Sequence, residues 1–263
     1  MMNAQDLYRA GKLDEAIEAL NGDVRKNPSD ADARAFLADL LCLVGNFERA
    51  DVQLDALAKI LPGAMAAVAL VRQLVRAEQW RQQCFLEGRL PELLGVPDER
   101  TKLHLKALAL LRSGDAPAAA ADLAHAEELR GSLRGNGQPG AFEDFRDADD
   151  LTSSFFEVLT STGKYYWIPM ERVARLELRP LERPRDLLWR RAAMQVSEGP
   201  EGEVYLPAIY APAPKETAAR LGRTTEWTES APVRGIGARC FLVGEELRTL
   251  HELGSLGEIT FGA

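Results

Sequence analysis

The feature that most constrains the fold is a set of similar residues that recur thirty-four positions apart near the start of the chain. Five pairs share this spacing: Gly11 and Gly45, Leu13 and Phe47, Ala16 and Ala50, Leu20 and Leu54, and Pro28 and Pro62. A glycine suits the turn between two antiparallel helices, an alanine lets the helices approach closely, and a proline ends the second helix. The period therefore predicts stacked helical hairpins.

Weaker copies of the pattern continue to about residue 130. One unit, offset by one residue from the strict period, has Leu103, Ala107, Leu110, Gly114, Ala119, Leu123 and Ala126 at the corresponding positions. Residues 63–95 form a degenerate unit in which Trp80 takes the aromatic position and the turn glycine is missing. We expect about four hairpins, two of them clear, and the period resembles that of tetratricopeptide repeats. A nonrepetitive helical bundle is the alternative, because alanine and leucine patterns are common in helices.

The chain changes character after residue 130. Residues 131–140, GSLRGNGQPG, are rich in glycine and predict a linker. Residues 149–162 have apolar side chains at helical spacing and predict one helix. Segments rich in branched or aromatic residues predict strands at 173–179, 187–196, 203–210, 238–243, 247–250 and 258–261, with a short helix at 215–221.

Together these segments predict an α+β protein of two domains. A chain of 263 residues exceeds the roughly 100–200 residues of a single hydrophobic core. We expect tetratricopeptide-like helical repeats in 1–130, a linker in 131–140, and a smaller, mainly antiparallel, β-rich α+β domain in 141–263.

Charge and composition narrow the classes of partner. The net charge of -8 and the pI near 5.1 argue against binding to nucleic acid or anionic lipid, because both require clustered positive charge. No apolar run approaches the roughly 18 residues of a membrane span, and the first residues lack an export signal. Cys42, Cys84 and Cys240 match neither a disulfide framework nor a zinc site. We therefore expect a cytoplasmic protein with no nucleic-acid or membrane partner.

Two charged segments in the second half have opposite sign. Residues 143–150 hold five carboxylates and one arginine, and residues 172–191 hold seven arginines and three carboxylates, so the local charges are -4 and +4. One interpretation is that they pair within the domain, with Asp147 and Asp150 bound to arginines such as Arg185 and Arg190. A second is a docking surface, since tryptophan, tyrosine and arginine carry much interface energy. Carboxylate catalysis or metal binding is the third.

Motifs for enzymatic chemistry are missing from the sequence. Neither the pair Gly163-Lys164 nor the segment Gly235-Ile236-Gly237 has the flanking residues of a phosphate-binding or dinucleotide-binding loop. His104, His125 and His251 are too scattered to form a metal site by local spacing, and no serine lies in a GxSxG turn. We therefore expect a protein without catalytic residues, cofactor or bound metal.

The second half resembles the ImpE family, also called the SciE or TagJ type, of accessory proteins encoded with bacterial type VI secretion systems. The resemblance rests on segments that occur in the order the family shows: FEDFRDADD at 142–150, GKYYWIP at 163–169, RPRDLLWR at 183–190, GEVYLPAIY at 202–210, RLGR at 220–223 and EW at 226–227. It implies a cytoplasmic, nonenzymatic protein that associates with the small subunit of the contractile sheath. It also implies a link to the AAA+ unfoldase that recycles the sheath.

Stacked hairpins form a concave surface that can hold an amphipathic helix or an extended peptide. We expect this groove to be lined by Tyr8, Asp32, Ala35, Asp39, Cys42, Thr101, His104 and Leu108. Given the family resemblance, we expect a helix of the small sheath subunit to bind there. The alternative function is a tetratricopeptide-type scaffold with an unrelated protein partner.

Overall fold

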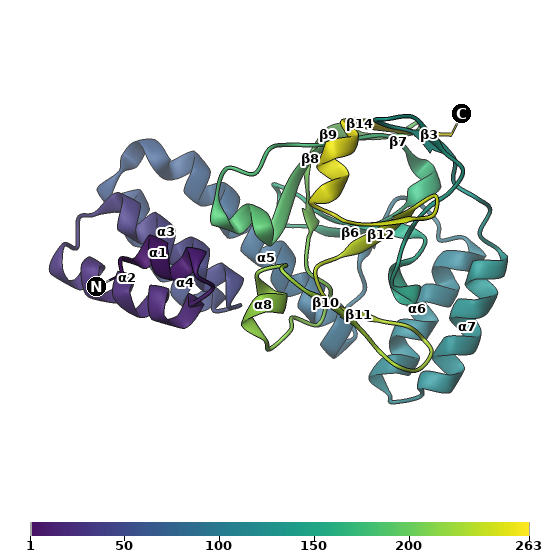
Figure 1. The fold of residues 1–263 in the computed structure, drawn as a ribbon, viewed down its shortest axis with the longest axis horizontal. Helices are drawn as coiled ribbons and strands as arrows, with labels where there is room; N and C mark the ends of the chain where they lie inside the picture. The colour runs from purple at the N-terminus through teal and green to yellow at the C-terminus, as the bar shows by residue number, and fades with distance from the viewer. Residues whose placement is uncertain (1, 263) are drawn as a thin grey trace.

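The repeat region folds into antiparallel helical hairpins, as its period predicts. A computed structural model describes residues 2–262, and in it α1 packs against α2, α3 against α4, and α6 against α7 (Figure 1). The bounds are α1 (Ala4–Arg9), α2 (Leu13–Lys26), α3 (Ala31–Leu43), α4 (Phe47–Ile60), α6 (Glu99–Arg112) and α7 (Ala116–Glu128). Gly11 and Gly45 have φ angles of 78° and 72°, a left-handed conformation that glycine adopts without steric cost.

Short polar side chains fix where these helices begin. Asn3, Asp30, Asn46, Asp98 and Asp115 each accept a hydrogen bond from a backbone N–H in the first turn of the helix that follows. Such caps satisfy donors that have no partner inside the helix and contribute about 1 kcal/mol each. The hairpins are therefore specified locally as well as by packing.

The degenerate unit at residues 63–95 is not a hairpin. A short 3₁₀ turn, η1 (Pro62–Ala64), leads into a single long helix, α5 (Met65–Glu87). No glycine or proline interrupts the sequence from Met65 to Glu87, and Gly88, with φ of 89°, ends the helix. Among residues 2–130 the structure thus has three hairpins and one long helix rather than four hairpins.

The second half is built on a nine-stranded sheet in residues 2–262, with the order β1-β6-β5-β9-β8-β7-β14-β2-β3. Neighbours are antiparallel except for β1 and β6. The bounds are β1 (Glu92–Leu93), β2 (Gly135–Asn136), β3 (Ala141–Phe142), β5 (Phe155–Leu159), β6 (Tyr165–Pro169), β7 (Val173–Leu178), β8 (Trp189–Val196), β9 (Glu201–Pro207) and β14 (Glu258–Phe261). The predicted α+β fold, with a mainly antiparallel sheet, is confirmed.

Smaller elements surround this sheet. A three-stranded sheet has the order β13-β12-β4, and β10 pairs with β11. The bounds are β4 (Phe145–Asp147), β12 (Cys240–Val243), β13 (Glu246–Thr249), β10 (Thr225–Trp227), β11 (Gly235–Gly237), α8 (Thr217–Arg220), η2 (Asp150–Thr152), η3 (Met170–Arg172), η4 (Pro184–Leu187) and η5 (Glu252–Leu256).

Two expectations about residues 131–162 differ from the structure. The helix predicted at 149–162 is wrong, because the chain there forms η2 and then strand β5. All five residues of β5 are buried, and a strand buried on both faces loses the alternation that identifies a strand in sequence. The glycine-rich segment 131–140 is partly structured, since β2 pairs with both β14 and β3.

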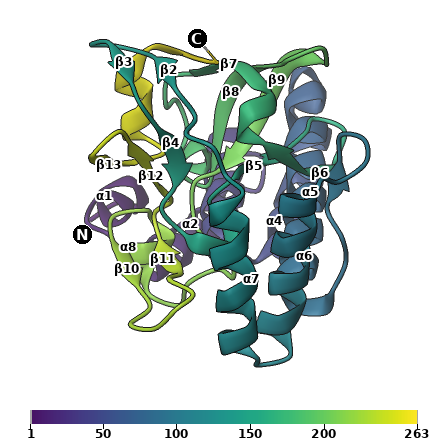
Figure 2. The same ribbon diagram turned by 90° about the vertical axis from the view of Figure 1, so that its right-hand side faces the viewer.

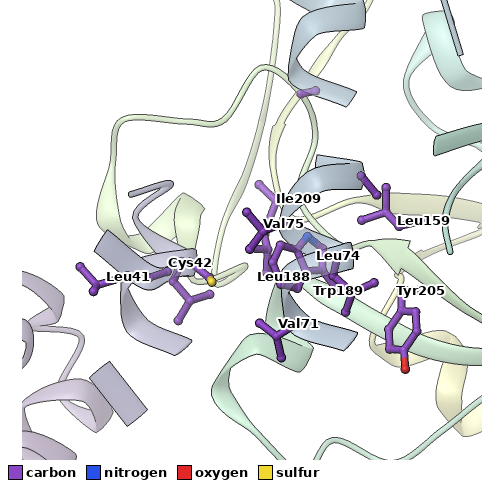
Figure 3. Close-up of a cluster of buried hydrophobic side chains, with 14 of the residues drawn as sticks. Leu41, Cys42, Val71, Leu74, Val75, Leu159, Leu188, Trp189, Tyr205 and Ile209 are labelled. Carbon is purple, nitrogen blue, oxygen red and sulfur yellow. The ribbon is translucent and has the colours of Figure 1, made fainter. Parts of the chain in front are cut away.

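One hydrophobic core joins the helices to the sheet. Leu74 and Val75 of α5 belong to the same buried cluster as Leu188, Trp189 and Ile209 of the second half (Figure 3). A second cluster covers the other face of the sheet with residues from β12 and η5 (Figure 2). The sheet is therefore covered on both faces, and the division between 1–130 and 141–263 stays a prediction.

Candidate functional site

A buried charge network holds α5 to the sheet. Arg81 donates two hydrogen bonds to the carboxylate of Glu157, at 2.8 and 3.1 Å, and one to the carbonyl oxygen of Ile209 at 2.9 Å. It also bonds Glu78 on its own helix at 3.1 Å. Both Arg81 and Glu157 are 1% exposed. Buried charges are tolerated only when they are paired and hydrogen-bonded, so this contact ties the two halves together.

The network continues through Glu157 into the second half. Glu157 also accepts hydrogen bonds from Tyr165 and Arg239. Arg239 lies 3.3 Å from the carboxylate of Asp147, which accepts a hydrogen bond from Tyr210 at 2.6 Å. Burial raises the pKa of Asp147 to about 6, although Arg239 opposes the shift. These contacts cross-link β5, β4 and the start of β12, which indicates a structural role.

The predicted partners of the two aspartates are wrong. Asp147 pairs with Arg239 rather than with Arg185 or Arg190. Asp150 pairs with Arg146 at 3.4 Å and accepts a bond from the backbone of Val233. The reason lies in the sheet: β4 pairs with β12, so Asp147 meets the arginine that directly precedes β12.

The two arginines lie elsewhere. Arg185 donates a 2.8 Å hydrogen bond to Asp39 on α3. Arg190 is 5% exposed and, within residues 2–262, its Nε and Nη1 have no hydrogen-bond partner. Burial lowers the pKa of Arg190, with Asp186 acting against the shift. Arg190 is therefore an unpaired buried cation that costs stability.

Replacing Arg190 with Met is expected to raise the free energy of unfolding by about 1–2 kcal/mol, because an unpaired charge is removed and the apolar stem is kept. Chemical denaturation followed by circular dichroism measures the change. The adjacent Arg191→Met is the control and is expected to have an effect within about 0.5 kcal/mol. A loss of stability in Arg190→Met would show that the guanidinium has a partner in solution.

Three predicted groove residues on α6 do not share a groove with those on α3. Thr101, His104 and Leu108 are buried. The ring of His104 packs edge-on against Phe155 with centroids 5.4 Å apart, and its Nε2 lies 3.1 Å from the hydroxyl oxygen of Ser154. The sheet of the same chain covers His104, whereas Thr101 reaches a separate depression of about 90 Å³ that Trp167 and Arg172 also line.

Three others, on α1 and α3, also contact the protein itself. Tyr8 packs edge-on against Phe36 with centroids 5.7 Å apart. Asp39 is 3% exposed and bound to Arg185, and Cys42 is 1% exposed. Burial raises the pKa of Asp39, although Arg185 opposes the shift. Asp39 and Cys42 are therefore occupied or covered, whereas Tyr8 is partly exposed.

Asp32 and Ala35 do line an open depression, which we call the α3–α5 hollow. It has a volume of about 140 Å³ and lies between α3, α4, α5 and the connection from β7 to β8. Asp39 reaches its wall, and so do Arg183 and Arg185. The apolar lining comes mainly from α4 and α5: Leu54, Leu57, Leu61, Ala64, Ala67, Val68 and Val71.

Sequence reasoning missed the α5 side of this hollow. The run Ala64–Val71 was the longest apolar run in the chain, and Ala66, Ala67 and Ala69 are exposed in the structure. Exposed apolar residues in one run on a helix could have indicated an interaction surface. The docking-surface interpretation of residues 172–191 included Arg183, but the sequence did not indicate that Arg183 would lie beside α3 and α5.

The structure offers little for metal or thiol chemistry. In the part of the chain that it describes, no three His, Cys, Asp or Glu residues lie close enough to hold a metal ion. All three cysteines are buried, and burial raises the pKa of each thiol, that of Cys84 to about 12. From residue 2 to residue 262, no helix has the length and apolarity needed to cross a membrane.

Comparisons with known proteins agree with this architecture. The ImpE protein family matches residues 139–257, and a tetratricopeptide repeat family matches residues 7–74. The type VI secretion system accessory component TagJ of Pseudomonas aeruginosa is 33% identical over 257 residues, which cover 97% of this chain and 90% of that protein. The crystal structure of protein VPA1032 from Vibrio parahaemolyticus has a TM-score of 0.90 at 28% identity and covers 99% of this chain and 97% of that one. The chain therefore belongs to the ImpE family of type VI secretion system accessory proteins.

Proposed function

We propose that this protein is a nonenzymatic cytoplasmic adaptor that holds a helix of the small sheath subunit in the α3–α5 hollow. The TagJ relative is a type VI secretion system accessory component, and the family resemblance implies the sheath as partner. The observation that carries the proposal is the hollow itself. It is an open apolar depression on the repeats, whereas Asp39, Cys42 and His104 are covered by or bonded to the same chain.

The size of the hollow fits one anchoring side chain. Its volume of about 140 Å³ is close to the roughly 150 Å³ of a cavity that takes up a benzene-sized group. A helix lying in a groove contributes such anchors from one apolar face. Leu61, 48% exposed at the rim, supplies further apolar area for the same face of the helix.

A charge placed in the hollow is expected to abolish this contact. Ala67 is exposed and lines the hollow, so Ala67→Glu is expected to weaken binding of the small sheath subunit at least about tenfold, since a carboxylate would be buried against an apolar anchor. Isothermal titration calorimetry with the purified subunit measures this. The matched control is Ala66→Glu, which makes the same change at an exposed α5 position outside the hollow. If Ala67→Glu and Ala66→Glu bound the small sheath subunit with equal affinity, the hollow would not be part of the interface.

The link to the unfoldase is proposed to run through the sheath subunit. Pull-downs with the small sheath subunit and the unfoldase N-domain, separately and together, test it. We expect the unfoldase to be retained only when the sheath subunit is present. Binding to neither protein would contradict the adaptor function.

A further inference from the structure

A second depression lies beside the α3–α5 hollow. It also has a volume of about 140 Å³. Its lining combines Leu70, Leu74, Trp189 and Tyr205 with five charged residues: Glu182, Arg183, Arg185, Asp186 and Arg191. We call it the α5–β8 hollow. Both hollows lie along α5, and both are lined by side chains of the connection between β7 and β8, residues 179–188, which we call the strap.

The two hollows lie on different sides of α5. Val68 and Val71 line the α3–α5 hollow, and Leu70 and Leu74 line the α5–β8 hollow. With about 3.6 residues per turn, these two pairs face directions about 110° apart around the helix axis. The residues that line both hollows are Arg183 and Arg185 of the strap. A partner seated in the α3–α5 hollow therefore reaches the strap at Arg183.

The strap is held in place at its start and in the middle. The backbone of Arg179 bonds to Arg191 across the β7–β8 pair, and Arg185 bonds to Asp39. The carboxylate of Asp186 accepts hydrogen bonds from the backbone N–H groups of Glu182 and Arg183, at 2.7 and 2.9 Å. A strap fixed in this way presents its exposed side chains in a defined position before a partner binds.

Arg183 lines both hollows and is the strap cation left without a partner. Arg185 pairs with Asp39, and Arg191, which lines the α5–β8 hollow, lies within 4 Å of Glu182 and Glu203. Across residues 2–262, Arg183 has no carboxylate within ion-pair distance, and it is exposed. An arginine in this position can bind a carboxylate with two parallel hydrogen bonds.

We infer that the partner helix places an apolar side chain in the α3–α5 hollow and an acidic side chain against Arg183. This inference rests on the proposed function and specifies the chemistry of the helix that the site accepts. The charge contact selects among amphipathic helices, because a helix with a basic residue at that position would meet Arg183 with the same sign of charge.

Charge reversal at Arg183 tests the inference. Titration calorimetry with the full-length small sheath subunit is expected to show binding weakened about tenfold by Arg183→Glu and a reduced dependence of affinity on salt. Arg25→Glu on α2, an exposed arginine outside both hollows, is the control and is expected to retain the affinity. Acid-to-lysine changes along the helices of the sheath subunit should then include one that restores binding to Arg183→Glu.

The outcomes separate this inference from the proposed function. If Arg183→Glu behaves like Arg25→Glu while Ala67→Glu still abolishes binding, the acidic contact is wrong and the hollow remains the site. If no acid-to-lysine change restores binding to a weakened Arg183→Glu, the pairing is also overturned. If Ala67→Glu has no effect either, the proposed function fails together with the inference.

Discussion

Replacing Arg81 with Met is expected to lower the free energy of unfolding by about 3–5 kcal/mol. The change leaves Glu157 with one of its two arginines and removes the donor to the carbonyl oxygen of Ile209. Both groups are buried, so water does not replace the lost bonds without opening the contact between α5 and the sheet. Urea denaturation followed by tryptophan fluorescence measures the effect, because Trp167 and Trp189 lie in the same core.

The control is Arg76→Met, which makes the same substitution at an exposed position of α5. A surface change of this kind is expected to stay within about 0.5 kcal/mol of the unchanged protein. If Arg81→Met lost less than about 1 kcal/mol of free energy of unfolding, as little as Arg76→Met, α5 and the sheet would be held together by apolar packing alone.

The helical half could be predicted from sequence wherever turn residues mark it. Gly11 and Gly45 adopt the left-handed turns that their spacing predicts. The prediction was wrong at residues 63–95, where a single long helix lies against the sheet. An amphipathic pattern indicates that a helix has a buried face but not which part of the protein covers it.

The second half was harder to predict because its contacts join distant segments. Blocks of opposite charge at 143–150 and 172–191 suggested pairing with each other. In the structure Asp147 pairs with Arg239, since strand order decides which residues meet. Strand β5 was taken for a helix because burial on both faces removes its alternation. Local charge and periodicity carry no information about such sheet neighbours.

The same limit applies to the partner-binding site. Repeat geometry predicts a concave surface, but the chain's own sheet and strap fill much of it, as the contacts of His104 with Ser154 and of Asp39 with Arg185 show. The α3–α5 hollow stays open, and the second half contributes Arg183 and Arg185 to it. Binding by this protein is therefore expected to need both halves of the chain.

His104 is expected to contribute stability that acidification removes. Burial against the sheet lowers the pKa of His104 to about 4, from 6.5 for an exposed imidazole. Below pH 6.5 the unfolded chain binds a proton that the folded protein excludes, so stability present above pH 6.5 is lost as the pH falls towards 4. The shift corresponds to about 3 kcal/mol over this range. Denaturation curves between pH 7.5 and 4.5 measure the loss.

The variant His104→Gln isolates this contribution, because glutamine keeps a polar contact for Ser154 but does not titrate. Its loss of stability between pH 7.5 and 4.5 is expected to be smaller than that of the unchanged protein by about 2–3 kcal/mol. Asp147, whose pKa is raised to about 6, binds a proton in the folded state first and so opposes the acid loss. That term is present in both proteins and cancels in the difference, as does the acid loss from His251, whose pKa burial also lowers to about 4. His125→Gln, at an exposed position of α7, is the control. If the free energy of unfolding depended on pH equally in His104→Gln and His125→Gln, His104 would bind a proton in the folded protein.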